Sequence, residues 1–398
     1  MFVEYLFEAN PITMLLLGLS TIFVIYLQTK PVTKNKNDMT ELEGIEYKYY
    51  PVNKEAKDGQ ESQSTGTGFS FLSYNIMAYN FTKASWYPYC DIDFLQARYR
   101  SPRILKELKQ ASPDIICLQE CDHDLYHEFY KPNLDKLGYE SLISAANPNR
   151  IVTIVIAYKR SVFSLVKKDY LDLNEDLDKL DDSFHKHKEA MIALLKHKIT
   201  GKSVTAVNTH LFWNPEYEYV KYGQISKIFK YIESKYNSSS IVISGDFNSM
   251  PWSNVLRYVY KIKPLVNSNA KGDYYNNKKY MDKFYTESLH NMNIRSAYEN
   301  YKPAAQGEKV GKKEDQTLMS EQIEEVKFNE LADNHPDFTN YTEEFNGCLD
   351  YILYSADKLE LNALMEVPNN IEIKNLKLPN YRYPSDHLKI AAQFRFSK

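Results

Sequence analysis

Short apolar runs of β-strand length recur along most of this chain and constrain its fold more than any other feature. The first begins at Phe69 with the alternating sequence Phe-Ser-Phe-Leu-Ser-Tyr. Two other stretches, residues 98–110 and 219–236, have the periodicity of amphipathic helices. Strands joined both by helices and by short turns predict an α/β fold, a two-sheet α/β sandwich. The later strand-like runs occupy residues 114–119, 151–158, 192–196, 203–209, 241–245, 349–354 and 389–396.

Polar side chains stand at or near the ends of these runs, where α/β enzymes place their catalytic groups. Each alone also fits an ordinary role, as a turn amide, a solvated acid or a structural histidine. Together they offer oxygen ligands for a hard metal ion, two imidazoles and spare carboxylates, which is the set that phosphodiester hydrolysis requires. The residues are Asn75, Glu120, His210, Asp246, Asn248, Asp350, Asp386 and His387.

Two of the acids carry specific local signals. Glu120 closes the mostly apolar run Asp-Ile-Ile-Cys-Leu-Gln, and burial of its charge would be costly without a partner such as a metal ion. Asp246 and Asn248 are two positions apart in a strand-like stretch, so their side chains can converge on one bound group. These residues predict a metal-dependent site.

The composition limits the partners that the chain can attract. Hydrophobic residues make up 43% and charged residues 25%, which is typical of a globular protein with a sizeable core. The formal net charge of −3 is too small to recruit nucleic acid by itself, so a nucleic-acid site would need a local basic groove. The four cysteines form no CxxC pair, which fits a reducing compartment and indicates no zinc site.

The N-terminus contains an uncharged stretch of 21 residues, from Ala9 to Thr29. As a helix it would reach roughly 30 Å, about the thickness of the hydrocarbon core of a bilayer. Glu4 and Glu8 precede it, unlike the basic start of a signal peptide, and lysines follow it. We therefore expect residues 1–30 to be a transmembrane anchor with the catalytic domain in the cytosol, on the endoplasmic reticulum or the mitochondrial outer membrane. A buried core helix is the alternative.

The rest of the chain divides into a linker and one domain. Residues 31–66 are polar and end in Ser-Thr-Gly-Thr-Gly, so we expect a flexible linker. Residues 67–398 form the predicted catalytic domain. Within it, residues 266–283 and 302–335 have little strand periodicity, and we expect surface loops, the second a disordered insertion.

Six motifs occur in the order Tyr-Asn, Leu-Gln-Glu, Asn-Thr-His-Leu, Gly-Asp-Phe-Asn-Ser, Leu-Asp-Tyr-Ile and Pro-Ser-Asp-His. This order resembles the signature of the endonuclease/exonuclease/phosphatase superfamily over residues 69–396. The segments Trp-Tyr-Pro-Tyr-Cys, Asn-Thr-His-Leu-Phe-Trp-Asn-Pro and Asn-Tyr-Thr-Glu-Glu-Phe are similar to its deadenylase branch, which includes nocturnin and the Angel proteins. Leu-Gln-Glu-Cys-Asp-His and Lys-Leu-Gly-Tyr are similar to fungal RNA exonucleases that trim ribosomal RNA.

The resemblance implies a metal site. Glu120 would ligate Mg²⁺, for which Mn²⁺ could substitute. Asn75 would lie beside it, and Asp386 would lie near a second metal.

The resemblance also implies the catalytic roles. Asp246 would orient or deprotonate the attacking water, and Asn248 would hold the scissile phosphate. His387 would donate to a phosphoryl oxygen and would be held in place by Asp350. His210 would also contact the phosphate.

The expected activity is Mg²⁺-dependent 3′-to-5′ exoribonuclease cleavage of RNA 3′ ends, with RNA rather than DNA as substrate. One departure leaves the substrate open, because Arg-Ile-Val-Thr at residues 150–153 replaces the His-Gly or Asp-Gly pair that the family has before this strand. The alternatives are a 2′,5′-phosphodiesterase, a dinucleotide phosphatase and a sphingomyelinase, although no apolar face for a lipid is readable from the sequence. An inactive membrane tether that binds RNA or a protein partner is the non-enzymatic alternative.

Overall fold

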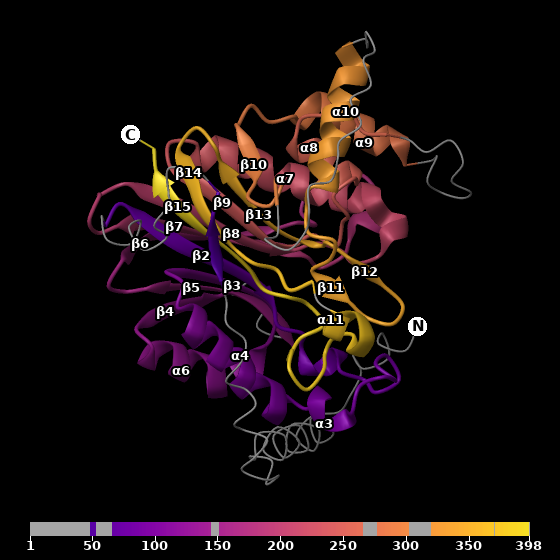
Figure 1. Ribbon diagram of the computed structural model, residues 1–398. Helices are drawn as coiled ribbons and strands as arrows, with labels where there is room; N and C mark the ends of the chain where they lie inside the picture. The colour runs from indigo at the N-terminus through magenta and orange to yellow at the C-terminus, as the bar shows by residue number, and fades with distance from the viewer. Residues whose placement is uncertain are drawn as a thin grey trace, which may run out of the picture.

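Two β-sheets pack face to face at the centre of the fold (Figure 1). The computed structural model describes residues 48–52, 66–144, 151–265, 277–301, 320–369 and 371–397. The first sheet contains, in spatial order, β1 (Tyr49–Pro51), β14 (Leu359–Met365), β15 (Ile390–Phe396), β2 (Gly68–Asn75), β3 (Ile115–Asp122), β5 (Val152–Lys159) and β4 (Tyr139–Ile143). The second contains β10 (Ile294–Ser296), β13 (Asp350–Ser355), β9 (Ser240–Asp246), β8 (Ser203–His210), β7 (Glu189–His197) and β6 (Phe163–Asp172). A small ribbon pairs β11 (Asn340–Tyr341) with β12 (Asn346–Gly347).

Helices cover the outer faces of both sheets, which gives four layers (Figure 1). Helices α4 (Ala97–Ala111) and α6 (Lys131–Lys136) pack on the first sheet. Helices α7 (Glu218–Tyr236), α8 (Asn254–Val259) and α9 (Lys278–Ser288) pack on the second. The other α-helices are α3 (Ile92–Leu95), α5 (His123–Leu125), α10 (Ser320–Asp333) and α11 (Ile371–Leu376). Single turns of other helix types are η4 (Tyr79–Phe81), η5 (Tyr126–Tyr130), η6 (Asp182–Phe184) and η7 (Pro215–Tyr217).

The central strands are buried on both faces, which explains why their sequences are continuous apolar runs. Along β2, Phe71 packs between the two sheets while its neighbour Leu72 packs under the helices. Along β3, Cys117 and Leu118 divide in the same way. The predicted strands and the predicted two-sheet α/β sandwich are confirmed, with small shifts at the strand ends.

Each sheet contains one parallel pair of strands, and all its other pairs are antiparallel. These parallel pairs are β2 with β3 and β8 with β9. In a parallel pair the carboxyl ends of both strands lie at the same edge of the sheet. The polar residues that close these four strands are therefore brought together in pairs.

Part of the predicted linker is structured. Residues 49–51 form β1 and pair with β14, so the expectation of a flexible linker over all of residues 31–66 is wrong at these positions. Two adjacent tyrosines explain the strand. Tyr49 packs against the core under the helices, and the Tyr50 ring lies 5.8 Å from that of Tyr301 in the core between the sheets.

Part of the predicted insertion at residues 302–335 is also structured. Residues 320–333 form helix α10, so the expectation of disorder is wrong there, while residues 302–319 lie outside the described residues. The helix is held by Phe328 and Ala332, which are four positions apart and both buried. The guanidinium carbon of the buried Arg257 lies 4.7 Å from the centre of the Phe328 ring, and this cation–π contact is favourable.

The predicted membrane anchor, residues 1–30, lies outside the described residues. Among the residues that the structure does describe, none of the helices combines the length and the apolar character needed to cross a bilayer.

A glycine fixes the end of β9. Gly245 has φ +148°, and a Cβ atom at this position would lie 1.8 Å from the Thr209 carbonyl oxygen of β8. We expect Gly245→Ala to lower the free energy of unfolding by about 3 kcal/mol or more, because overpacking adds to backbone strain. Urea unfolding measures the loss. Gly201→Ala is the control, since Gly201 also has a positive φ but no atom within 4 Å of its Cβ position. An equal loss in both variants would show that the contact with Thr209 has no cost.

Candidate active site

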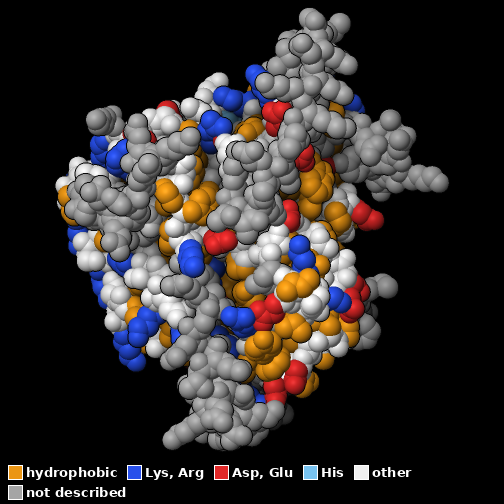
Figure 2. All heavy atoms as spheres, in the orientation of Figure 1, with side chains coloured by type: hydrophobic (Ala, Val, Ile, Leu, Met, Phe, Trp, Pro, Cys, Tyr) orange, Lys and Arg blue, Asp and Glu red, His pale blue; other side chains and the backbone are white. Residues whose placement is uncertain are grey.

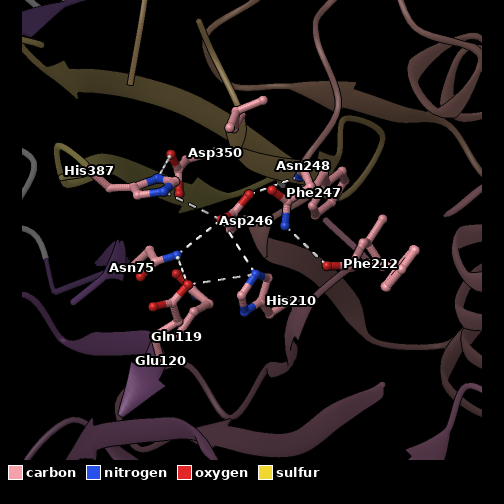
Figure 3. Close-up of polar contacts among 12 residues, drawn as sticks. Asn75, Gln119, Glu120, His210, Phe212, Asp246, Phe247, Asn248, Asp350 and His387 are labelled. Carbon is pink, nitrogen blue, oxygen red and sulfur yellow. Dashed lines mark hydrogen bonds and ion pairs between the residues drawn. The ribbon is translucent and has the colours of Figure 1, made fainter. Parts of the chain in front are cut away.

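The register of the second sheet brings three predicted residues together. Asp246 ends β9 and lies beside His210, which ends the parallel strand β8. On its other side Asp246 lies beside Asp350, which begins the antiparallel strand β13. A histidine and two carboxylates therefore occupy adjacent positions at one edge of this sheet (Figure 3).

The first sheet contributes Asn75 and Glu120. Glu120 has φ +56° at an irregularity in the pairing of β3, which turns its side chain toward the other sheet. The amide nitrogen of Asn75 donates to Glu120 Oε1 at 3.1 Å and to Asp246 Oδ2 at 3.0 Å (Figure 3). Asn75 thus links carboxylates that come from different sheets.

Asn75 presents its nitrogen, not its oxygen, to these acids. Its Oδ1 accepts a hydrogen bond from the Met77 backbone N–H at 3.0 Å. This arrangement differs from the expectation that Asn75 belongs to the metal ligands, because an amide nitrogen donates hydrogen bonds and does not bind Mg²⁺. In this structure Asn75 positions Glu120 and Asp246.

Asp246 lies at the centre of the site. Its Oδ1 accepts a hydrogen bond from the Asn248 backbone N–H at 2.8 Å. Its Oδ2 lies 3.6 Å from Nε2 of His210 and 3.6 Å from Nε2 of His387. Burial raises the pKa of Asp246 to about 7, against the opposing effect of His387, and the nearby Asp350 and Glu120 carboxylates raise it further. A group with such a pKa can exchange a proton at neutral pH.

His387 and Asp350 form a buried pair. His387 Nδ1 lies 2.8 Å from Asp350 Oδ2, and the Thr339 hydroxyl donates to the same oxygen at 2.6 Å. Burial alone would lower the pKa of His387, but Asp350 and Asp246 outweigh it and hold that pKa well above its usual value. These carboxylates favour the imidazolium form of His387, whose Nε2 points into the site (Figure 3).

The surroundings of His210 favour its neutral form. Burial lowers the pKa of His210 well below its usual value, and the positive charges of Lys188 and His387 add to this effect. A neutral imidazole can accept a proton or bind a metal ion, whereas the imidazolium of His387 can only donate. The two histidines flank Asp246 with different chemistry.

The side chains at this edge fit a divalent cation. Ligand atoms of Glu120, His210 and Asp246 all lie within 4.8 Å of one another. Burial raises the pKa of Glu120, and the charge of Asp386 raises it further, so a cation here would stabilise the carboxylates. Carboxylate oxygens are the ligands that Mg²⁺ prefers.

A second group has the same spacing but suits a cation less well. It consists of Asp246, Asp350 and His387. The Asp350 and Asp246 carboxylates raise the pKa of His387 and so favour its protonated form, which offers no lone pair to a metal ion. Among the described residues, Asp350 Oδ1 is buried without a hydrogen-bond partner.

The two remaining predicted residues lie at the rim. Asp386 is outside both groups of candidate ligands, and its Oδ2 accepts a hydrogen bond from the Tyr87 hydroxyl at 2.9 Å. Asn248 has φ +48°, and its amide nitrogen donates to the Leu211 carbonyl oxygen at 3.1 Å (Figure 3). The carbonyl of Asn248 accepts a hydrogen bond from the buried Lys221 at 2.7 Å.

Sequence reasoning missed a buried hydrogen-bond network behind the site. Asn208 accepts from the Gln119 amide at 2.7 Å and donates to the carbonyls of Leu118 and Val155, so it ties β8 to the first sheet. Asn208 is two positions before His210 and lies on the same face of β8. This spacing could have identified Asn208 from the sequence as a residue that points toward the site.

Sequence reasoning also missed the role of Arg100. This buried guanidinium donates to the carbonyls of Leu95, Ile76, Met77 and Pro384. It fixes the loop after β2 to the loop that carries the Asp-His motif.

The comparison with known proteins identifies the family. A model described as the Endonuclease/Exonuclease/phosphatase family matches residues 72–387, which is most of the chain. The chain belongs to this family. Its predicted resemblance to the deadenylase branch is also confirmed by the relatives described next.

The chain is similar to the CCR4-Not complex 3′-5′-exoribonuclease subunit Ccr4 of Yarrowia lipolytica, with 28% identity over 377 residues. It is also similar to the carbon catabolite repressor protein 4 homolog 1 of Arabidopsis thaliana, with 29% identity over 366 residues. Each alignment covers 83% of this chain but only 48% and 58% of the respective relatives. The chain therefore spans about half of the length of these relatives.

Solved structures show the same fold. ANGEL2, a 2′,3′-cyclic phosphatase, gives a TM-score of 0.67 at 23% identity and covers 88% of this chain and 99% of its own. The human nocturnin catalytic domain gives a TM-score of 0.57 at 19% identity and covers 88% of this chain and 97% of its own.

Proposed function

We propose that this chain is a Mg²⁺-dependent 3′-to-5′ exoribonuclease that releases nucleoside monophosphates. The observation that carries the proposal is the position of Asp246. Its carboxyl group is buried between two histidines whose surroundings shift their pKa values in opposite directions, and Asn75 connects it to Glu120. Hydrolysis of a phosphodiester needs this combination of a base, a proton donor and a cation site.

The protonation states that the surroundings favour suggest how the catalytic roles are divided among these residues. Asp246 orients the attacking water and accepts its proton, and the Asn248 N–H holds Asp246 in place. His387 donates a hydrogen bond from Nε2 to a phosphoryl oxygen as negative charge develops there. Glu120, with His210 beside it, would hold Mg²⁺, which would supply charge neutralisation at the phosphate.

The choice of RNA 3′ ends is supported by the relatives. Several matched proteins are named 3′-5′-exoribonuclease subunits of the CCR4-Not complex. This chain covers about half of the length of these relatives, so their named activity is proposed for it here.

One observation favours a second candidate, hydrolysis of a phospholipid such as sphingomyelin. Exposed apolar side chains gather over α3 and α11, among them Ile92, Ile371 and Tyr381 (Figure 2). The structure thus shows an apolar face that the sequence did not reveal. The face borders the site, because Tyr89 donates to the Leu378 carbonyl after α11 and its ring lies 6.2 Å from that of Tyr87, which donates to Asp386.

Purified full-length chain with Mg²⁺ tests these candidates on matched concentrations of oligo(A), 2′,5′-linked oligo(A), NADP, adenosine 2′,3′-cyclic phosphate and sphingomyelin vesicles. We expect 3′,5′-linked oligo(A) to have the highest kcat/KM. A higher value for any other substrate would reject the exoribonuclease proposal in favour of that substrate, and no turnover of any would favour the inactive tether.

We further propose that residues 1–30 anchor the enzyme to a membrane. Deletion of these residues is expected to move the protein from carbonate-washed membranes to the soluble fraction, without loss of turnover on short RNA. The fold should survive because the described structure begins at residue 48 with the segment that contains β1. Cell fractionation and turnover per mole of enzyme measure both effects. A truncated protein that still pellets with the membranes would contradict the anchor.

A further inference from the structure

Apolar side chains on two short helices form an exposed surface that borders the site. Ile92 on α3 is exposed, as are Ile371 and Leu376 on α11 and Tyr381 in the loop after α11. Figure 2 shows hydrophobic side chains gathered over α3 and α11. We call these four residues the apolar face. Among them the exposed fraction is highest at Ile371, whose side chain is 72% exposed.

Contacts between the two helices make the apolar face one continuous surface. The Phe94 ring of α3 lies 6.4 Å from the Tyr381 ring. The Tyr99 hydroxyl on α4 donates to the Tyr381 carbonyl at 2.9 Å. The Tyr381 hydroxyl donates to Glu372 Oε1 on α11 at 2.7 Å. Tyr381 therefore joins two segments that are far apart in the sequence.

The apolar face is not needed to hold the two helices on the domain. Leu95 fixes α3, because it is buried in a small cluster with Met77. Ile373 fixes α11, because it is fully buried in the core between the sheets. Ile92 and Ile371 instead present apolar surface to water, and neighbouring exposed apolar side chains of this kind mark an interaction site.

The charges around the apolar face do not favour nucleic acid as its partner. Lys377 lies 2.9 Å from Glu343, and Arg382 lies 2.6 Å from Glu372, so both cations are paired with carboxylates. Within α3 and α11 themselves there is one base against two acids. A phosphate backbone binds where positive charge is in excess, whereas an uncharged lipid surface binds through buried apolar area.

The chain enters the described fold next to the apolar face. The Lys48 carbonyl accepts a hydrogen bond from the Glu366 N–H at 2.9 Å, and α11 begins five residues after Glu366. Residues 30–47 separate this point from the uncharged stretch Ala9–Thr29. Even a fully extended segment of this length spans at most roughly 65 Å. A bilayer that holds residues 9–29 therefore lies within reach of the apolar face.

We propose that the apolar face docks on the surface of a bilayer of uncharged phospholipid, with Ile92 and Ile371 inserted among the lipid headgroups. This docking rests on the proposed anchor at residues 1–30, which keeps the domain close to the lipid. It adds an orientation to the anchor, because the active site borders the apolar face and so lies beside the bilayer. It does not require that a lipid be the substrate.

A fluorescent label at position 371 tests the docking in the full-length chain. Ile371→Cys is made in a Cys90→Ser background and labelled with nitrobenzoxadiazole, since the other three cysteines are buried. The labelled chain is reconstituted in phosphatidylcholine vesicles, with or without lipids that carry a nitroxide at the headgroup. We expect the nitroxide lipids to remove more than about half of the emission, because a docked apolar face lies at the depth of the headgroups.

Ile199→Cys in the same background is the matched control. Ile199 is also 72% exposed, but it lies between β7 and β8, at the opposite end of β8 from His210. Its label should keep its emission with nitroxide lipids. Adding Ile92→Glu to the chain labelled at position 371 should restore most of the lost emission, because a carboxylate resists transfer into lipid. Cleavage of bis(4-nitrophenyl) phosphate should be the same in all these variants, which verifies that the fold is intact.

The outcomes separate the docking from the anchor. A chain that stays on carbonate-washed vesicles, without quenching at position 371 or with equal quenching at position 199, would overturn the docking and leave the anchor standing. Unquenched emission at position 371 that is shifted to shorter wavelength would also overturn the docking, because residues 9–29 or a second copy of the chain would then cover the apolar face. A chain that washes off the vesicles would overturn both.

Discussion

Glu120→Gln is expected to lower kcat on RNA by more than about 100-fold, a loss beyond that caused by removing an outer partner of a metal ligand. The amide has nearly the same shape as the carboxylate, but it brings no charge to a hard cation. The measurement is kcat on oligo(A) over a wide range of Mg²⁺ concentrations. Full activity at ordinary Mg²⁺ would reject Glu120 as a metal ligand.

Thermal unfolding provides a second readout that does not depend on turnover. Mg²⁺ should raise the Tm of the wild-type protein, because a cation that binds only the folded state stabilises it, and should have little effect on Glu120→Gln. Without Mg²⁺ the variant should be no less stable than wild type, since the folded state raises the pKa of Glu120 and so disfavours its charge. A variant that is unfolded without Mg²⁺ would assign Glu120 a structural role instead.

Asp350→Asn and His387→Ala are each expected to lower the single-turnover rate on oligo(A) by roughly 10²- to 10⁴-fold, the range of positioned acid–base groups. The carboxylate of Asp350 both fixes the imidazole and keeps it protonated. Because the two residues act as one unit, the double variant should lose little more than the worse single variant. Additive losses would reject the coupling.

The pH profile distinguishes this role from a structural one. Asp350 raises the pKa of His387, so its removal lowers that pKa. If the protonated imidazole is the active form, the alkaline limb of the Asp350→Asn profile should shift to lower pH. A loss of stability with an unchanged rate and profile would mean that Asp350 only holds β13 to Thr339.

The sequence was sufficient to identify the candidate site residues, but it did not predict how their side chains are arranged in space. Glu120 and Asp246 stood out because acids closed strongly apolar runs, and the structure brings both to the same edge. The amide orientation of Asn75 could not be predicted, since it depends on the Met77 N–H and on a carboxylate from the other sheet. Thr339 was missed because its hydroxyl meets Asp350 only through the fold.

Several elements were missed for a different physical reason. Strand β6 carries exposed lysines along an edge of the second sheet, so its sequence lacks an apolar run. Helix α10 appeared as a charged insertion because its sequence is rich in charged residues, while among its described side chains Phe328 and Ala332 are buried. Both cases follow from partial burial, which leaves a weak hydrophobic pattern.

The central claim is tested most directly by the products formed from oligo(A) labelled at its 5′ end, with purified full-length chain and Mg²⁺. The account predicts stepwise shortening of the labelled strand from its 3′ end and release of adenosine monophosphate as the single small product. Both should disappear with EDTA and in Glu120→Gln. Cleavage at internal positions, or intact RNA at all Mg²⁺ concentrations, would contradict it.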